Sequence, residues 1–187
     1  MKLLSILFTL ATIGSALAQA IQLPVLPDGA YIISIGEDGK PTWTNITAKV
    51  AEPPAMVKRE PASIVIEARP DWPSGTYARC PSGNWFLSTD LYTQSEGTWE
   101  TFFEQCESSG SYQFPAGTAL TNYQGTSVSY MCAYSANSCS ISEWHDAVGW
   151  VQGSCGGRSN GWQEPAYLHI PAWNKRYGYA KSGSSIC

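Results

Sequence analysis

The alternation of apolar and polar residues predicts that much of this chain forms β-strands. Residues 30–35 and 42–46 are rich in β-branched and aromatic side chains, and the turn sequence Glu37-Asp38-Gly39-Lys40 separates them, which predicts a β-hairpin. Residues 62–68 and 167–170 are typical of shorter strands. Residues 128–134 alternate large and small side chains, so we expect a strand with one buried face and one face of small polar residues.

Two other segments have the spacing of helices. In residues 98–106, three aromatic residues and a cysteine recur at positions i, i+3, i+4 and i+7, which places them on one helical face. Ser140-Ile141-Ser142-Glu143 has the pattern of a capping box, in which a hydroxyl and a carboxylate bond to amides of the first turn. The expected buried stripes of the two helices are Trp99, Phe102, Phe103 and Cys106, and Trp144, Ala147, Val148 and Val151.

The order of these elements predicts an α+β fold. Strands and helices alternate without the long apolar runs of a parallel sheet, so we expect an antiparallel sheet with two short helices. The hairpin at residues 30–46 has an apolar face that two strands alone do not bury. We expect it to pair with the following domain, as part of a pro-region. The alternative is that it is the first hairpin of a single uncleaved domain.

The first residues have the features of a secretory signal peptide. A lysine follows Met1, residues 3–10 are apolar, and Ala16-Leu17-Ala18 or Ala18-Gln19-Ala20 offers a site for signal peptidase. The apolar part is too short to span a membrane, and no other segment reaches that length. We expect residues 1–18 to be removed and the product to be an extracellular monomer without a membrane span.

The basic pair Lys58-Arg59 marks the next expected boundary. It ends a segment with two adjacent prolines, Pro53 and Pro54, which is unsuited to the interior of a helix or strand. A secretory protease of the kexin type cuts after such pairs. We therefore expect a pro-region over residues 19–59 and a mature domain over residues 60–187. The alternative is that the pair lies in an ordinary linker.

All six cysteines follow the basic pair. An even number of cysteines in an oxidising compartment predicts three disulfides, for which the sequence allows fifteen connectivities. Their spacing matches no common zinc pattern, so we expect no metal site. Cys187 has one apolar neighbour and is expected to be bonded, since it would otherwise fray. The six are Cys80, Cys106, Cys132, Cys139, Cys155 and Cys187.

The charge balance disfavours polyanionic partners. The whole chain has a net charge of −4, and the expected mature domain has six basic and eleven acidic residues. Nucleic acid and anionic membrane are poor partners for such a surface. No phosphate loop or dinucleotide signature is present, and we expect no cofactor.

A catalytic hypothesis has to be built from Glu143, His145, His169 and Arg158. A small secreted ribonuclease needs a histidine, a glutamate and an arginine around one phosphate, and a glycosidase needs two carboxylates in a cleft. The residue types are present, but their spacing resembles neither family. His145 lies opposite the apolar stripe of its helix and is expected at the surface. These four remain candidates, and we favour binding over catalysis.

Candidate binding residues lie late in the chain. Residues 155–162 are expected to form a flexible surface loop that contains Arg158 and Trp162. Trp162 and Trp173 are the tryptophans for which an exposed role stays open, since exposed rings suit either sugar or protein ligands. Asn45-Ile46-Thr47 is an acceptor sequence for N-glycosylation.

As a whole, the plan of signal peptide, hairpin, basic pair and six-cysteine domain resembles the small secreted cysteine-rich effectors of fungi. It is similar to the toxins of necrotrophic plant pathogens that are released by kexin cleavage. That resemblance implies a secreted virulence protein that acts by engaging a protein of a host or competitor. The alternatives are a secreted hydrolase, either ribonuclease-like or directed at cell walls, and a carbohydrate-binding or antimicrobial protein.

A narrower likeness concerns the last third of the chain. The order Cys132-Ala133-Tyr134, Ala147 with Val151, and Cys155-Gly156 ahead of a terminal cysteine resembles the virally encoded killer toxins of smut fungi. That family implies an α/β sandwich that blocks calcium channels. The chain has far fewer cysteines than that toxin and lacks its basic character, so its active lysine is not assigned to Lys175 or Lys181.

Overall fold

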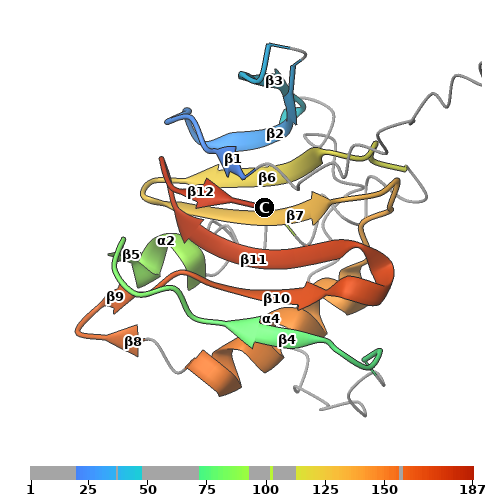
Figure 1. Ribbon diagram of the computed structural model, residues 1–187. Coiled ribbons are helices and arrows are strands. Elements are labelled where there is room, and N and C mark those ends of the chain that lie inside the picture. Colours follow the sequence, from blue (N-terminus) through green and yellow to red (C-terminus); the bar gives the residue numbers. More distant parts are fainter. Residues whose placement is uncertain (1–19, 37, 48–71, 93–101, 103–112, 156–157) are drawn as a thin grey trace, which may run out of the picture.

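The computed structural model describes residues 20–36, 38–47, 72–92, 102, 113–155 and 158–187. Its main element is a seven-stranded sheet with the strand order β3-β2-β6-β7-β11-β10-β4, and every pairing in it is antiparallel (Figure 1). The strands are β2 (Gly29–Ile35), β3 (Pro41–Asn45), β4 (Tyr77–Arg79), β6 (Thr118–Gln124), β7 (Ser127–Ala133), β10 (Ala166–Ile170) and β11 (Lys175–Lys181).

Two smaller sheets and two α-helices complete the described structure. Strand β1 (Ile21–Gln22) pairs with β12 (Ser185–Ile186), and a three-stranded sheet consists of β5 (Phe86–Leu87), β9 (Trp162–Gln163) and β8 (Arg158–Ser159). The helices are α2 (Ser88–Tyr92) and α4 (Ile141–Cys155), with a 3₁₀ helix, η1, at Pro171–Trp173. A sheet-rich fold with antiparallel pairing and two helices is confirmed for these residues, although α2 was not predicted and is not the helix expected at 98–106, and α4, with 15 residues, is not short.

The large sheet separates two apolar cores. Helices α2 and α4 lie behind it in Figure 1, and the β1–β12 pair lies in front. The core on the helix side contains Leu120, Met131, Leu168 and Tyr177 from the sheet and the expected stripe of α4. The core on the front contains Ile21, Leu23, Ile33, Tyr123, Val128, Cys132 and Ile186.

Strand β7 is buried on both faces, which corrects the expectation of one solvent-facing side. Ser127 and Ser129 are both fully buried. They alternate with Val128 and Tyr130 and so point to the helix side, where α2 packs against β7. The small polar side chains of β7 therefore face a helix and not solvent. Their small size lets α2 pack closely against the strand.

The first hairpin is part of the large sheet. Strands β2 and β3 pair from Tyr31 opposite Asn45 to Ile35 opposite Pro41, and β2 also pairs with β6 over residues 29–34. Ile33 is fully buried beneath the front face. The hairpin thus has the sheet partner that its apolar face requires. That residues 19–59 form a pro-region stays a prediction.

Helix α4 begins with half of the expected capping box. The Ser140 hydroxyl accepts a bond from the Glu143 amide at 3.5 Å, as the pattern predicts. The Glu143 carboxylate instead accepts bonds from Lys175 Nζ at 2.7 Å and from the Tyr177 hydroxyl at 2.8 Å. The Ser140 amide donates to that tyrosine hydroxyl at 3.2 Å, so a tertiary partner replaces the reciprocal local bond.

The disulfides tie the ends of elements together. Cys80, just after β4, is bonded to Cys155 at the end of α4, and Cys132 in β7 is bonded to Cys187, as expected for the last cysteine. Cys139 is also disulfide-bonded. Cys106 lies outside the described residues, so the third predicted pair stays a prediction.

Some sequence expectations fall outside the described residues. These are the strand at 62–68 and all of the helix at 98–106 except Phe102, whose ring is buried 4.5 Å from that of Trp144. The expectation of a flexible loop at 155–162 is wrong for its second half. Residues 158–163 form a β-hairpin with a two-residue turn, and the turn residues Asn160 and Gly161 both have positive φ. Among the described helices, none has the length and apolar content needed to cross a bilayer.

Candidate functional site

The β1–β12 pair covers only part of the front of the sheet. Strands β4, β10 and β11 continue beyond it, and their front-facing side chains are tyrosine, histidine and arginine. His169 on β10 is paired with Tyr77 on β4 and with Arg176 on β11, so the three side chains form one row across the strands. We define the Tyr–Arg face as Tyr77, Arg79, Tyr134, Tyr167, His169 and Arg176.

The rings and cations of the Tyr–Arg face contact one another. The Arg176 guanidinium carbon lies 4.1 Å from the centre of the Tyr167 ring and 5.5 Å from that of Tyr134. The His169 ring lies 5.3 Å from the Tyr77 ring and 5.5 Å from the Tyr134 ring. Such contacts hold a long arginine side chain in one orientation, so its N–H groups are presented in a fixed direction.

Gly178 makes room for this arrangement. A Cβ at this position would lie 2.6 Å from Tyr167 Cβ and 2.7 Å from the Tyr130 hydroxyl. These distances are far below van der Waals contact. The missing side chain therefore lets Tyr130 and Tyr167 lie against strand β11, beside Arg176.

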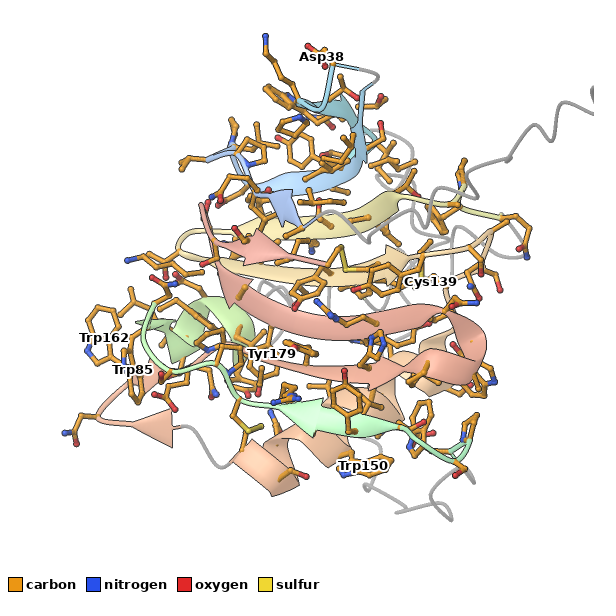
Figure 2. All side chains as sticks on the ribbon, in the orientation of Figure 1. Asp38, Trp85, Cys139, Trp150, Trp162 and Tyr179 are labelled. Atoms are coloured by element: carbon orange, nitrogen blue, oxygen red, sulfur yellow. A yellow bond between two sulfur atoms is a disulfide. The ribbon has the colours of Figure 1, made fainter. Side chains whose placement is uncertain are left out.

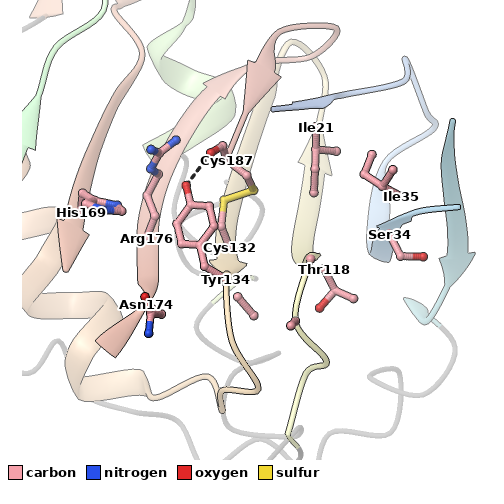
Figure 3. Close-up of a pocket in the computed structure, with 13 residues that line it drawn as sticks. Ile21, Ser34, Ile35, Thr118, Cys132, Tyr134, His169, Asn174, Arg176 and Cys187 are labelled. Carbon is pink, nitrogen blue, oxygen red and sulfur yellow. Dashed lines mark hydrogen bonds between the residues drawn. A yellow bond between two sulfur atoms is a disulfide. The ribbon is translucent and has the colours of Figure 1, made fainter. Parts of the chain in front are cut away.

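A pocket of about 820 Å³ lies between the Tyr–Arg face and the N-terminal strands. Figure 3 shows His169 and Arg176 on one side, the Cys132–Cys187 disulfide in the middle, and Ile21 and Ile35 on the other side. The Tyr134 hydroxyl donates a hydrogen bond to an oxygen of the Cys187 terminal carboxylate. The remaining lining residues are Ser34, Ala116, Gly117, Thr118, Ala133 and Asn174.

The charged groups of the pocket are Arg176 and the terminal carboxylate of Cys187. Ion pairs among the described residues join Lys40 to Asp38, His145 to Asp146 and Lys175 to Glu143, and none of them involves Arg176.

Two nitrogen atoms in this pocket also lack partners. Arg176 Nε and His169 Nδ1 are buried without a hydrogen-bond partner within the described part of the chain. Burial, and then the nearby Arg176 charge, lowers the pKa of His169, while burial raises the pKa of Tyr134 to about 12. At neutral pH the pocket therefore contains the positive charge of Arg176 and the negative charge of the Cys187 terminal carboxylate, together with a neutral imidazole and a neutral phenol.

Glu143, His145 and His169, the catalytic candidates whose side chains the structure describes, do not meet in one cleft. His169 belongs to the front face, whereas Glu143 lies on the helix side, bound to Lys175 and Tyr177. Alternation along β11 places Lys175 and Arg176 on opposite faces of the sheet. His145 is exposed on α4, beside Asp146 at 3.9 Å. Arg158 begins β8, on the small sheet.

The tryptophans for which an exposed role stayed open have different surroundings. Trp162 is exposed and pairs with Leu87 across β9 and β5, and Trp85 lies two residues before Leu87, on the same side (Figure 2). We call Trp85, Leu87 and Trp162 the Trp patch. Trp173 is partly buried, with its ring 5.4 Å from that of Trp72 and Lys175 Nζ 5.9 Å from its centre.

The predicted modification sites are only partly described. Asn45 is exposed at the end of β3, and its Oδ1 accepts a bond from the Thr47 amide at 2.8 Å. Lys58 and Arg59 lie outside the described residues. Within the ranges that the structure describes, no group of three or more histidine, cysteine, aspartate or glutamate side chains is placed to hold a metal ion.

Most of the Tyr–Arg face was not predicted from the sequence. His169 was a candidate for a different reason, and Tyr77, Arg79, Tyr134, Tyr167 and Arg176 were not singled out for the site. Alternation over residues 175–181 places Arg176 and Gly178 on the same side. The pairing of β4 with β10 joins residues about 90 positions apart, and no local pattern signals it.

No protein-family model, curated protein or solved structure matches the chain.

Proposed function

We propose that the protein is a secreted effector or toxin that acts by binding a protein of a host or a competitor, after kexin-type cleavage following Arg59. The observation that supports this most is the Tyr–Arg face. Tyrosine and arginine are enriched at protein interfaces, where a rigid ring buries much surface and a planar guanidinium makes several directed bonds. Here both residue types occupy an uncovered part of a disulfide-tied sheet, which holds them in place before a partner arrives.

The charge of the face favours an acidic patch on the partner. The Tyr–Arg face contains two arginines and no carboxylate, although the whole chain has a net charge of −4. Neither arginine takes part in an ion pair among the described residues. Carboxylates of a partner would supply the missing counter-charges and help to fix its orientation.

The disulfides are compatible with the secreted part of the proposal. Bonds such as Cys80–Cys155 and Cys132–Cys187 persist in oxidising compartments and are rare in reducing ones. Secretion, the host and cleavage after Arg59 belong to the proposal itself.

Leaf infiltration tests this function. The protein cleaved after Arg59, with its N-terminal chain still associated, is applied to a panel of plant hosts, and cell death is scored against the double variant Tyr77→Ala, Arg79→Ala. Both residues lie on the short edge strand β4 and are exposed, so their loss should leave the fold intact. We expect a response in some hosts that the double variant loses.

Trp162→Ala supplies the matched control, because it removes an exposed ring on β9, which belongs to a different sheet from β4. It should keep the response. Uniform silence across hosts would argue against the proposal, and so would a response that the β4 variant retains in full.

A carbohydrate-binding or antimicrobial protein is the second candidate, and the Trp patch is the observation that favours it. Two exposed indole rings on one side of a small sheet can stack on sugar rings. Retention on chitin or β-glucan beads, with loss in Trp162→Ala but not in Tyr77→Ala, would support this reading over the first. Absence of retention on either polymer would remove it.

A further inference from the structure

Strand β3 places an exposed tryptophan beside a modification site. Asn45-Ile46-Thr47 is the one acceptor sequence for N-glycosylation in the chain, and Trp43 lies two residues before Asn45. Asn45 is exposed, and Trp43 is 50% exposed. We propose that Asn45 carries an N-linked glycan whose first N-acetylglucosamine ring stacks on the Trp43 indole. The proposal rests on the secreted part of the function proposed above, because such glycans are attached in the secretory pathway.

The register of the first hairpin places the two side chains on one side of β3. Trp43 lies opposite Ile33, and Asn45 lies opposite Tyr31. Both β2 residues belong to the front core, and directly opposed residues share a face, so Trp43 and Asn45 both lie on the front of the sheet. Residues two positions apart in a strand are about 6.5 Å apart. A sugar attached to Asn45 is therefore within reach of the indole ring.

The outer side of β3 leaves room for that sugar. Strand β3 is at the end of the strand order, and its partner among the described strands is β2 (Figure 1). The Ile46 amide donates to the Ala30 carbonyl at 2.8 Å. Because bonded and non-bonded pairs alternate in an antiparallel ladder, the backbone groups of Trp43 and Asn45 point away from β2. A glycan on Asn45 would lie over this unpaired edge, which is otherwise open to other chains.

The surroundings of the two side chains favour the contact. Asn45 Oδ1 accepts a bond from the Thr47 amide at 2.8 Å, which fixes the side-chain amide whose Nδ2 atom would carry the sugar. Among the described residues, Trp43 belongs to neither apolar core. The apolar C–H face of a sugar ring packs well on an indole, and the contact would remove apolar surface of Trp43 from water.

Attachment of the glycan needs a lipid-linked oligosaccharide as its donor. Asn45 Nδ2 forms the bond to C1 of the first sugar and loses one proton. The bond from C1 to the lipid pyrophosphate breaks, and its electron pair leaves with the pyrophosphate. In the folded chain Thr47 Oγ1 accepts a bond from the Ala30 amide at 2.9 Å, so the hydroxyl of the acceptor sequence is already occupied. We therefore expect transfer to precede the pairing of β2 with β3.

The glycan would lie apart from the Tyr–Arg face. Strands β2, β6 and β7 separate β3 from β11 in the sheet. At about 4.8 Å between neighbouring strands, β3 and β11 are about 19 Å apart. A sugar on Asn45 therefore leaves the Tyr–Arg face open to a protein partner. The test of the sugar and the leaf assay can fail independently.

Intact mass tests attachment. Residues 19–187 are produced behind a yeast leader in a strain without kexin, so that the chain is secreted and stays continuous. Endoglycosidase H then trims each glycan to a single N-acetylglucosamine. We expect the mass of one such sugar on the wild type and none on Asn45→Asp.

Urea denaturation tests the stacking. The one-sugar chain and Asn45→Asp are compared with Trp43 present and with Trp43→Ala, and the charge of the aspartate cancels because it is common to both comparisons. With Trp43 present, the sugar should lower the unfolding constant by about two- to tenfold more than with alanine, which is the range of an aromatic contact. Trp43→Phe should keep part of this effect. Trp162→Ala, which also removes an exposed indole, should leave it unchanged.

NMR spectra of the sugar show whether the contact is direct. A ring stacked on the indole should have proton signals shifted upfield by the ring current, and Trp43→Ala should remove this shift. The proposal is wrong if Asn45 carries no sugar, if the sugar stabilises both backgrounds equally, or if a folded Trp43→Ala variant leaves the sugar signals unchanged. A leaf response that accompanies any of these results would retain the protein-binding function and remove the glycan contact alone.

Discussion

At the scale of single residues, Glu143 and Arg176 differ from what the sequence predicted for them. Glu143 was a catalytic candidate, and its carboxylate is used to hold α4 to β11 through Lys175 and Tyr177. Arg176 was not ranked, and it takes part in no ion pair between side chains among the described residues. Glu143 contacts β11 on the helix side of the sheet, whereas the Arg176 side chain lies on the front side.

The ion pair between Lys175 and Glu143 should be important for stability. Lys175 is almost fully buried, so Glu143→Gln leaves a buried ammonium without its counter-charge. We expect the free energy of unfolding to fall by about 2–3 kcal/mol, below the ~3–5 kcal/mol of fully buried pairs because Glu143 is 26% exposed. Urea denaturation measures this change.

Asp146→Asn is the control, because its contact with His145 at 3.9 Å is near the surface and should be worth about 0–1 kcal/mol. Equal effects of the two substitutions would contradict a structural role for the buried pair. Loss of any catalytic activity with retained stability in Glu143→Gln would return Glu143 to the catalytic hypothesis.

His169 predicts a specific dependence of stability on pH. Its pKa in the folded state lies below the unfolded value of about 6.5, because burial and Arg176 disfavour the proton. The unfolded chain therefore takes up this proton first. The stabilisation is present above pH about 6.5 and is lost as the pH falls from that value towards the folded pKa.

Urea denaturation of the wild type, His169→Gln and His145→Gln at pH 7.5 and 5.5 isolates this effect. Other groups also titrate in this range, so the comparison is between slopes. His169→Gln should lose less stability than the wild type on acidification, whereas His145→Gln, at an exposed site, should behave like the wild type. A wild-type slope in His169→Gln would rule out this contribution.

At the scale of elements, local sequence patterns predicted several of the strands and helix α4, but they did not predict which strands pair with one another. Alternation over residues 128–134 and 167–170, the hairpin at 30–46 and the stripe from Trp144 to Val151 all correspond to elements of the structure. Each depends on contacts within a few residues. The strand order depends on pairings between distant segments, such as β2 with β6, which no local pattern encodes.

A local signal was also missed in residues 158–163. Asn160-Gly161 between short flanking runs is the strongest short-range hairpin sequence, because both residues tolerate positive φ. The surrounding glycines and serine led instead to the expectation of a loop. The candidate site was predicted least well, since its six members come from four separate segments of the chain.

Strand β11 depends on the absence of a side chain at Gly178. Gly178→Ala would place a Cβ 2.6 Å from Tyr167 Cβ and should lower the free energy of unfolding by about 1–3 kcal/mol through overpacking. It should also displace Tyr167 from Arg176. Thermal unfolding and the NMR signals of Arg176 measure the two effects.

Gly149 in α4 is the matched control, because nothing lies within 4 Å of the position its Cβ would take. Gly149→Ala should be neutral or stabilising by up to about 1 kcal/mol, the difference in helix propensity. If Gly178→Ala were as well tolerated as Gly149→Ala, the close packing against β11 would be disproved.

At the scale of the whole molecule, the N-terminal strands are built into the folded body. Ile21, Leu23, Tyr31 and Ile33 are buried in the front core, and β2 lies between β3 and β6. Hydrogen bonds from the Tyr123 hydroxyl to Pro24 and from Thr121 to Tyr31 add to this attachment. No cysteine precedes Cys80, so the attachment is entirely non-covalent apart from the chain itself.

We therefore predict that cleavage after Arg59 gives two associated chains rather than a released pro-region. Removal of residues 20–47 would expose the front core and the edge of β6 to water. Kexin-treated protein should show two bands on a denaturing gel and one species, with the mass of both chains, by native mass spectrometry. Separation of the chains under native conditions would show that the hairpin is dispensable.

The pairing of β1 with β12 has one more consequence. Ile21 lies opposite Ile186, so two segments from opposite ends of the described chain are neighbours in the same ribbon. A circular permutant that joins residue 187 to residue 20 through a short linker, and opens the chain between Arg59 and Glu60, would keep every strand neighbour of the large sheet. Its folding would show that the order in which these strands are connected is not what specifies their arrangement.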